Sequence, residues 1–210
     1  MIVVQDDFYP NPEEVREKAL QEFFFPGVKG KRIMFPGQRT ISSFSNENFV
    51  YVKNRLETIL NRKIIHFAKR NSNTAFTLGL ETKEYKNWVH HDFANYTEKT
   101  TKLMDGEAWA SVCYLTPNAP VTHGTGLFRD KEKQSIQCRD DLRISMESFT
   151  GTWEQKENSS WELHTYVGNV YNRLVMYPAT YWHAPFNAGW GHDKETGRLV
   201  QVCFFSTEKQ

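Results

Sequence analysis

The chain of 210 residues has almost no charge surplus, few cysteines and no long apolar run. Its 26 Lys and Arg residues face 25 Asp and Glu residues, which disfavours a protein that binds mainly by neutralising nucleic-acid phosphates. Its 3 cysteines form no Cys-x-x-Cys pair, and this favours a reducing compartment over a disulfide framework. No apolar stretch approaches the ~20 residues that cross a bilayer. We therefore expect a cytoplasmic protein without a membrane partner.

Aromatic residues are plentiful, at 14% of the chain, and short β-like runs dominate its second part. Two helices are expected first, between Pro12 and Phe25 and over residues 46–62, because apolar residues recur there at spacings of three and four. The Gly- and Pro-containing stretch between them, residues 26–45, is predicted to be coil. The expected strands are 63–69, 74–81, 88–93, 108–116, 161–167, 173–177 and 198–206, besides a short one at residues 2–4.

Many short strands with few helices between them predict a mainly β sandwich or barrel with flanking helices. We expect one domain over residues 1–210. In it residues 1–62 form an N-terminal helical brace, and residues 63–210 form the β core. The polar stretch 128–160 is predicted to be an insertion that contains a helix.

A candidate metal site lies in the run Trp88–Phe93, which contains His90, His91 and Asp92. Side chains alternate along a strand, so His90 and Asp92 share one face and His91 points away. His183, after a later apolar strand, can supply a third ligand. Two His and one carboxylate form the arrangement of non-haem Fe(II) oxygenases. Alternatively, the His-x-Asp pair is a surface hydrogen bond and His183 is an ordinary histidine.

A candidate anion site lies at Arg198, which opens a strand and shares a face with Val200 and Val202. A buried guanidinium requires an anion, and its geometry matches a carboxylate through two parallel hydrogen bonds. Arg173 is the competing arginine. The alternative role for Arg198 is a structural ion pair. For Tyr114, the alternative is a core aromatic residue with a hydrogen-bonded hydroxyl.

The order and spacing of several segments resemble the 2-oxoglutarate- and Fe(II)-dependent oxygenases of the prolyl-hydroxylase-like type. The chain is most similar to an uncharacterised branch of them found in tailed phages and marine bacteria. The resemblance spans about residues 74–206, and the segments 8–10 and 35–40 also look like that branch. The segments that carry it are Trp109–Thr116, Gly124–Phe128, Asn172–Pro178, Tyr181–Pro185 and Arg198–Phe205.

This resemblance implies roles for five residues. His90, Asp92 and His183 match the iron ligands of the family. Arg198 matches the basic residue that pairs with the far carboxylate of 2-oxoglutarate, and Tyr114 matches the tyrosine whose hydroxyl also reaches it. The implied fold is a double-stranded β-helix, or jelly-roll, with the N-terminal helices packed on the major sheet.

The chain departs from the family pattern at two threonines. Thr125 stands between Gly124 and Gly126, where the family usually has Gly-Gly before an acidic residue. Thr116 stands where Asn is usual. These departures leave the three iron ligands unchanged but set the chain apart from known hydroxylase subgroups.

The implied function is that of a dioxygenase, a hydroxylase that couples oxidative decarboxylation of 2-oxoglutarate to oxidation of an unidentified primary substrate. Its cofactors and partners are Fe(II), 2-oxoglutarate, O₂ and that substrate. The expected location is the cytoplasm of a bacterial or phage-infected cell, and nucleic acid is not expected as a partner. Two alternatives remain: a cupin-like metalloenzyme that does not use 2-oxoglutarate, and a non-catalytic jelly-roll binding or phage structural module. Residues expected around the substrate are Arg39, Trp182, Trp190 and His192.

Overall fold

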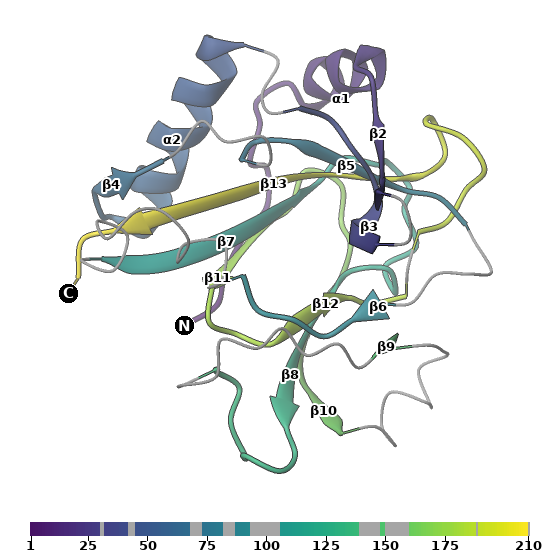
Figure 1. Cartoon of the computed structure of the whole chain (residues 1–210). Coiled ribbons are helices and arrows are strands. Elements are labelled where there is room, and N and C mark those ends of the chain that lie inside the picture. The colour runs from purple at the N-terminus through teal and green to yellow at the C-terminus, as the bar shows by residue number, and fades with distance from the viewer. Residues whose placement is uncertain are drawn as a thin grey trace.

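The computed structural model describes residues 1–29, 32–41, 45–67, 73–81, 87–92, 106–138, 148–149, 160–187 and 189–209. In this part of the chain the protein is mainly β, with two helices, and every strand pair is antiparallel. The helices lie on one side of a large sheet, and a smaller sheet lies on the other side (Figure 1).

The two helices form where the apolar spacing predicts them. Helix α1 (Pro12–Gln21) has proline in its first turn, where no intrahelical amide hydrogen bond is lost. Helix α2 (Asn46–Leu60) begins after Ser45, whose hydroxyl accepts a hydrogen bond from the Asn48 amide at 3.1 Å. It ends at Asn61, which adopts the left-handed conformation. At 15 residues, α2 is the longest helix described, and it is too short and polar to cross a membrane.

The strands of the described residues form three sheets. The large sheet has the order β1 (Val3–Gln5), β11 (Leu174–Pro178), β7 (Glu107–Tyr114), β13 (Arg198–Thr207), β5 (Phe76–Gly79), β3 (Arg32–Arg39) and β2 (Phe25–Lys29), with β4 (Ile64–His66) also paired to β13. The small sheet has the order β10 (Trp161–Val167), β8 (Thr125–Asp130) and β12 (His183–Pro185). A two-stranded pair joins β6 (Asn87–Trp88) to β9 (Ser148–Phe149).

The two faces of the large sheet carry separate buried clusters, because side chains alternate along each strand. The face toward the helices contains Leu199 and Cys203 of β13, which pack with Leu56 of α2. The opposite face contains Val200 of β13 and Tyr114 of β7, which pack with Leu127 of the small sheet. We call this second face the inner face, since it lies between the two sheets (Figure 1).

The coil prediction for residues 26–45 is wrong in part, because β2 and β3 form a hairpin there. Helix α1 also ends at Gln21, well before Phe25, where β2 begins. Pro26 is tolerated because β2 is an edge strand, where one missing amide donor costs little. Gly37 has a φ of +75°, and a Cβ there would lie 2.3 Å from the Leu78 carbonyl oxygen. The glycine therefore allows a close strand approach, which composition alone cannot distinguish from coil.

Two strands of the small sheet were not predicted, namely β8 and β12. Residues 128–130, assigned to the insertion, belong to β8, and the following described residues form turns and isolated bridges. The helix expected in this stretch is absent from the described residues 128–138, 148–149 and 160. The remainder of that expectation lies outside the described residues.

Candidate metal centre and anion pocket

The three expected metal ligands meet because two distant segments pair through their backbones. His183 begins β12, and the His90 segment follows β6. The His90 amide donates to the His183 carbonyl at 2.9 Å, and the His183 amide donates to the His90 carbonyl at 2.8 Å. The Asp92 amide donates to the Ala179 carbonyl at 2.9 Å, which fixes the other end of the segment. Both segments are thereby held in register.

The ligand atoms of His90, Asp92 and His183 all lie within 4.8 Å of one another. His183 Nε2 is 3.2 Å from one Asp92 carboxylate oxygen, and His90 Nε2 is 4.0 Å from the other. Adjacent ligands bound at ~2.1 Å to one ion at right angles lie about 3 Å apart. The pair of His183 and Asp92 already has this spacing, and His90 needs only a small adjustment.

The His183 ring is oriented by a contact behind it. Its Nδ1 lies 2.9 Å from the Tyr181 carbonyl oxygen, which can only accept a hydrogen bond. The Nδ1 atom therefore carries a proton, and Nε2 is the nitrogen that faces Asp92 and can bind a metal. Metal-binding histidines characteristically hold their second nitrogen in this way. The ring thus has the orientation that a metal site requires.

The Asp92 carboxyl is buried, and burial by itself raises its pKa. The charge and hydrogen bond of His183 oppose this, and the charges of His90 and Arg39 add to the opposing effect. The net result is a pKa below the ordinary value. A buried ionised carboxylate beside two imidazoles is the donor set of a facial triad with open positions.

His91 is not among these ligands, although the strand expected over residues 88–93 is present only as β6 and an isolated bridge at His90. Its side chain is buried, and its ring packs 4.9 Å from that of Trp182. Trp182 packs equally close to Trp161. Trp182, expected near the substrate, thus lies in a packed aromatic cluster and is only 4% exposed.

A second polar group on the inner face surrounds Tyr114, whose hydroxyl lies 2.7 Å from the Thr125 hydroxyl. The Arg198 guanidinium carbon is 5.6 Å from the centre of the Tyr114 ring, and Arg198 Nε donates to the His123 carbonyl at 3.1 Å. Burial raises the pKa of Tyr114 to about 12, so its hydroxyl stays protonated at neutral pH. The structure therefore places a cation beside a neutral hydroxyl, a pair suited to a carboxylate.

Both threonines that depart from the expected pattern have defined contacts here. Thr125 supports the Tyr114 hydroxyl, as described above. The buried Thr116 hydroxyl donates to the Gly197 carbonyl at 2.7 Å and accepts from the Leu199 amide at 2.8 Å. It therefore fixes the backbone on both sides of Arg198.

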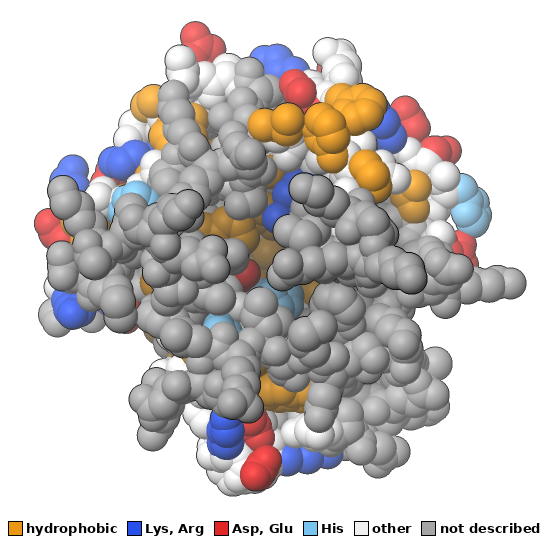
Figure 2. Space-filling view, viewed as in Figure 1, with side chains coloured by type: hydrophobic (Ala, Val, Ile, Leu, Met, Phe, Trp, Pro, Cys, Tyr) orange, Lys and Arg blue, Asp and Glu red, His pale blue; other side chains and the backbone are white. Residues whose placement is uncertain are grey.

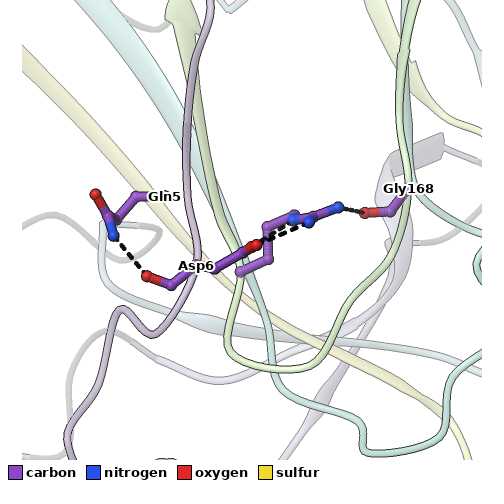
Figure 3. Close-up of polar contacts among 4 residues, drawn as sticks. Gln5, Asp6 and Gly168 are labelled. Atoms are coloured by element: carbon purple, nitrogen blue, oxygen red, sulfur yellow. Dashed lines mark hydrogen bonds and ion pairs between the residues drawn. The ribbon is translucent and has the colours of Figure 1, made fainter.

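Arg173, the competing arginine, forms an ion pair with Asp6. Its Nε and Nη2 donate to the two Asp6 oxygens at 2.6 and 2.9 Å. Its Nη1 donates to the carbonyl of Gly168 at 3.4 Å, and Figure 3 labels Asp6 and Gly168 at the two ends of this set of contacts. The Asp6 carboxylate already neutralises Arg173, and this makes Arg198 the better candidate for an external anion.

The sequence comparison assigns the chain to a family. A family of unknown function (DUF6445) matches residues 1–205. The chain belongs to this family. No curated protein matches it in sequence.

Three solved structures share the fold of this DUF6445 member. HygX from Streptomyces hygroscopicus, with nickel and 2-oxoglutarate bound, has 12% identity and a TM-score of 0.56, covering 98% of this chain and 82% of its own. The non-haem α-ketoglutarate-dependent epimerase SnoN from nogalamycin biosynthesis has 12% identity and a TM-score of 0.56, and the match covers 98% of this chain and 78% of SnoN. AviO1 from Streptomyces viridochromogenes has 11% identity and a TM-score of 0.53, and the match covers 98% of this chain and 89% of AviO1. At such identities the likeness establishes the fold alone.

The remaining expected substrate residues of this DUF6445 protein lie in different settings. Arg39, expected in coil, ends β3, and its charge acts on Asp92. The half-buried Trp190 packs against the His123 ring at 5.1 Å. The His192 ring lies 3.6 Å from Glu81, and its side chain is 86% exposed. Figure 2 shows a hollow on one face, where basic, acidic and His side chains lie close together.

Sequence reasoning missed two contributors to the anion pocket. The His123 carbonyl holds Arg198, and the Thr125 hydroxyl meets Tyr114. A backbone carbonyl carries no sequence signal. Thr125 did carry a sequence signal, because it stands between Gly124 and Gly126. Neighbouring atoms lie so close to both glycines that a Cβ would clash there.

Proposed function

We propose that the protein is a 2-oxoglutarate- and Fe(II)-dependent dioxygenase that hydroxylates an unidentified primary substrate. The observation that carries the proposal is the cluster of His90, Asp92 and His183, whose ligand atoms lie within 4.8 Å of one another. The proposal includes a jelly-roll of one domain with its helices packed on the major sheet. It also includes a cytoplasmic location and the branch found in phages and marine bacteria.

The three side chains would hold Fe(II) and leave positions open for other ligands. When bound, the metal together with 2-oxoglutarate and O₂ would supply the oxidising chemistry, with succinate and CO₂ as products. The chain itself contributes the ionised Asp92 carboxylate and the fixed orientation of the His183 ring. These features hold the ligand set ready, so that little reorganisation is needed on binding.

Arg198 and Tyr114 would hold the far carboxylate of 2-oxoglutarate. Arg198 is 7% exposed, and its Nε is already positioned by the His123 carbonyl. Its guanidinium would pair with the carboxylate while the Tyr114 hydroxyl donates a further hydrogen bond. The apolar residues around them, Leu127 and Val200 among them, would exclude water from this pocket and strengthen the pairing.

The structural relatives support this assignment of cofactors. HygX has been solved with nickel and 2-oxoglutarate, and SnoN with Fe³⁺, α-ketoglutarate and nogalamycin RO. These are properties of those two proteins. Their fold and the triad of this chain together favour the same cofactor pair here.

The deciding experiment measures anaerobic Fe(II) binding by calorimetry, then 2-oxoglutarate binding to the loaded protein, then succinate formation in air. We expect both ligands to bind in order, with slow succinate formation even without the primary substrate. Binding of Fe(II) without 2-oxoglutarate would indicate a cupin-like metalloenzyme instead. A protein that binds neither would be a non-catalytic module.

A further inference from the structure

Arg39 lies on the inner face of the large sheet, in the same cross-strand row as Tyr114. Arg39 is paired with Thr77, Thr77 with Val200, and Val200 with Tyr114, across four adjacent strands. Directly opposed residues of antiparallel strands point to the same face. Tyr114 and Val200 belong to the inner-face cluster, so Arg39 extends from that face too.

The Arg39 side chain is held in a defined orientation. Its Nε donates to the buried Thr77 hydroxyl at 3.1 Å, and the residue is half-buried at the end of β3. Gly37, two positions earlier, lets β3 approach β5 closely. With Nε directed at Thr77, the edge formed by Nη1 and Nη2 has the geometry for a bidentate oxyanion.

Arg39 and Arg198 occupy separate positions on this face. Val200 is two residues from Arg198 along β13, and Arg39 is two strands away from Val200. Strand spacing and rise place the two Cα atoms about 12 Å apart. The Arg198 guanidinium lies 5.6 Å from the centre of the Tyr114 ring, whereas Arg39 is three strands away from Tyr114 in the same row. Arg198 is therefore the arginine beside Tyr114, and Arg39 occupies a different part of the inner face.

The separation of the two cations has a chemical consequence. The far carboxylate of one 2-oxoglutarate molecule would engage Arg198 beside Tyr114, whose Cα atoms belong to other strands than that of Arg39. Arg39 extends from the inner face, and the His183 ring packs against Tyr177 of that same face at 4.7 Å. Arg39 and this metal ligand therefore border the same space between the sheets, where the reacting part of a primary substrate must come. A guanidinium at that position selects for negative charge in the group that approaches.

We propose that Arg39 binds an oxyanion of the primary substrate, a carboxylate or a phosphate, so that the enzyme acts on anionic molecules. This inference rests on the proposed function and assigns its substrate class. Arg39 would be a specificity-determining residue that orients the substrate beside the metal ligands, while the inner-face residues toward Tyr114 serve the cosubstrate.

The test uses the full chain loaded anaerobically with Fe(II) and 2-oxoglutarate, and calorimetric titration with two matched probe pairs. N-acetylglycine against N-acetylglycinamide tests a carboxylate, and glycerol phosphate against glycerol tests a phosphate. We expect the anion of one pair to bind the wild-type protein more tightly than its neutral partner. That preference should fall about 10- to 150-fold in Arg39→Gln, the factor of one charge-assisted hydrogen bond, and should be partly retained in Arg39→Lys.

Controls separate this inference from the proposed function. Arg173→Gln removes a guanidinium that pairs with Asp6 and should leave the anion preference unchanged. The affinity of Arg39→Gln for 2-oxoglutarate should stay within about threefold of wild type, since this ligand is held elsewhere. Failure of the wild-type protein to bind Fe(II) and 2-oxoglutarate would overturn the proposed function.

Three results would overturn the inference alone. In the first, the loaded protein shows no anion preference in either probe pair. In the second, Arg39→Gln keeps the preference of the wild-type protein. In the third, Arg39→Gln loses 2-oxoglutarate binding while Arg198→Met keeps it, which would make Arg39 the cosubstrate anchor. Thermal unfolding of Arg39→Gln and Arg39→Lys distinguishes each result from loss of the fold.

Discussion

His90 and His183 exchange two backbone hydrogen bonds, of 2.9 and 2.8 Å, and their rings lie 4.3 Å apart. The same pairing therefore fixes both the backbone register and the separation of two candidate ligands. Asp92 is two residues further along the chain, where its amide donates to the Ala179 carbonyl at 2.9 Å and so holds it beside the other two ligands. Three backbone hydrogen bonds between distant segments thus assemble the three side chains.

The candidate ligands should be separable from their neighbour His91 by substitution. We expect His90→Ala or Asp92→Ala to abolish tight Fe(II) binding, because each removes one of three donors. His91→Ala should keep most of the Fe(II) affinity, although it loses the contact with Trp182 and some stability. Anaerobic calorimetry with Fe(II) measures the affinities. An essential His91 with a dispensable His90 would contradict the face assignment.

The anion pocket makes a prediction about the cosubstrate. Arg198→Met should weaken 2-oxoglutarate binding about 10- to 150-fold and leave Fe(II) binding largely intact, since a charge-assisted hydrogen bond contributes roughly 1.5–3 kcal/mol. Arg173→Gln is the matched control, because Asp6 neutralises that guanidinium. Calorimetric titration of the metal-loaded variants gives both affinities. Equal affinity in wild type and Arg198→Met would move the anchor to another residue.

Thr116 should be more important for stability than its size suggests. Thr116→Val removes a buried hydroxyl that serves both the Gly197 carbonyl and the Leu199 amide. Leaving a buried polar group unpaired costs about 1–3 kcal/mol, and we expect a loss of that size in the free energy of unfolding. Urea denaturation measures the change. The exposed Thr122→Val should change it by no more than about 0.5 kcal/mol, and equal effects of both variants would argue against the role of Thr116.

The pair of Asp6 and Arg173 should make a small pH-dependent contribution to stability. The Arg173 hydrogen bond and charge hold the pKa of Asp6 below its ordinary value. A carboxyl whose pKa is lowered by folding stabilises the protein above its unfolded-state pKa, and this contribution is lost as the pH falls through the folded-state value. The Asp6 side chain is 54% exposed, so solvent screening limits the contribution to ~0.2–1 kcal/mol.

Thermal unfolding of wild type and Asp6→Asn between pH 2.5 and 7 tests this contribution. We expect wild type to be the more stable protein at pH 6, and the difference to shrink as the pH falls through the lowered folded-state pKa of Asp6, because the carboxyl then becomes protonated in both folded and unfolded protein. A difference that persists at the lowest pH would mean that Asp6 acts through its shape or packing and not through its charge.

Much of the fold could be predicted because its signals are local. Helix α2 and strands β7 and β13 follow the periodicity of apolar residues, which reflects the geometry of the chain itself. The β2–β3 hairpin and strands β8 and β12 could not be predicted in this way. These segments are either very short or contain Gly or Pro, so they show no strand periodicity. They form strands because the strands beside them supply hydrogen-bond partners.

The sequence by itself predicted that His90 and Asp92 share a side of an extended segment and that Arg198 shares a face with apolar residues, because side chains alternate along an extended chain. Only the tertiary structure decided that His183 pairs with His90, that Thr125 meets Tyr114, and that Arg39 extends from the inner face. The physical reason is that strand pairing and register depend on which distant surfaces bury one another. Such long-range burial leaves no periodic trace in the segments that it joins.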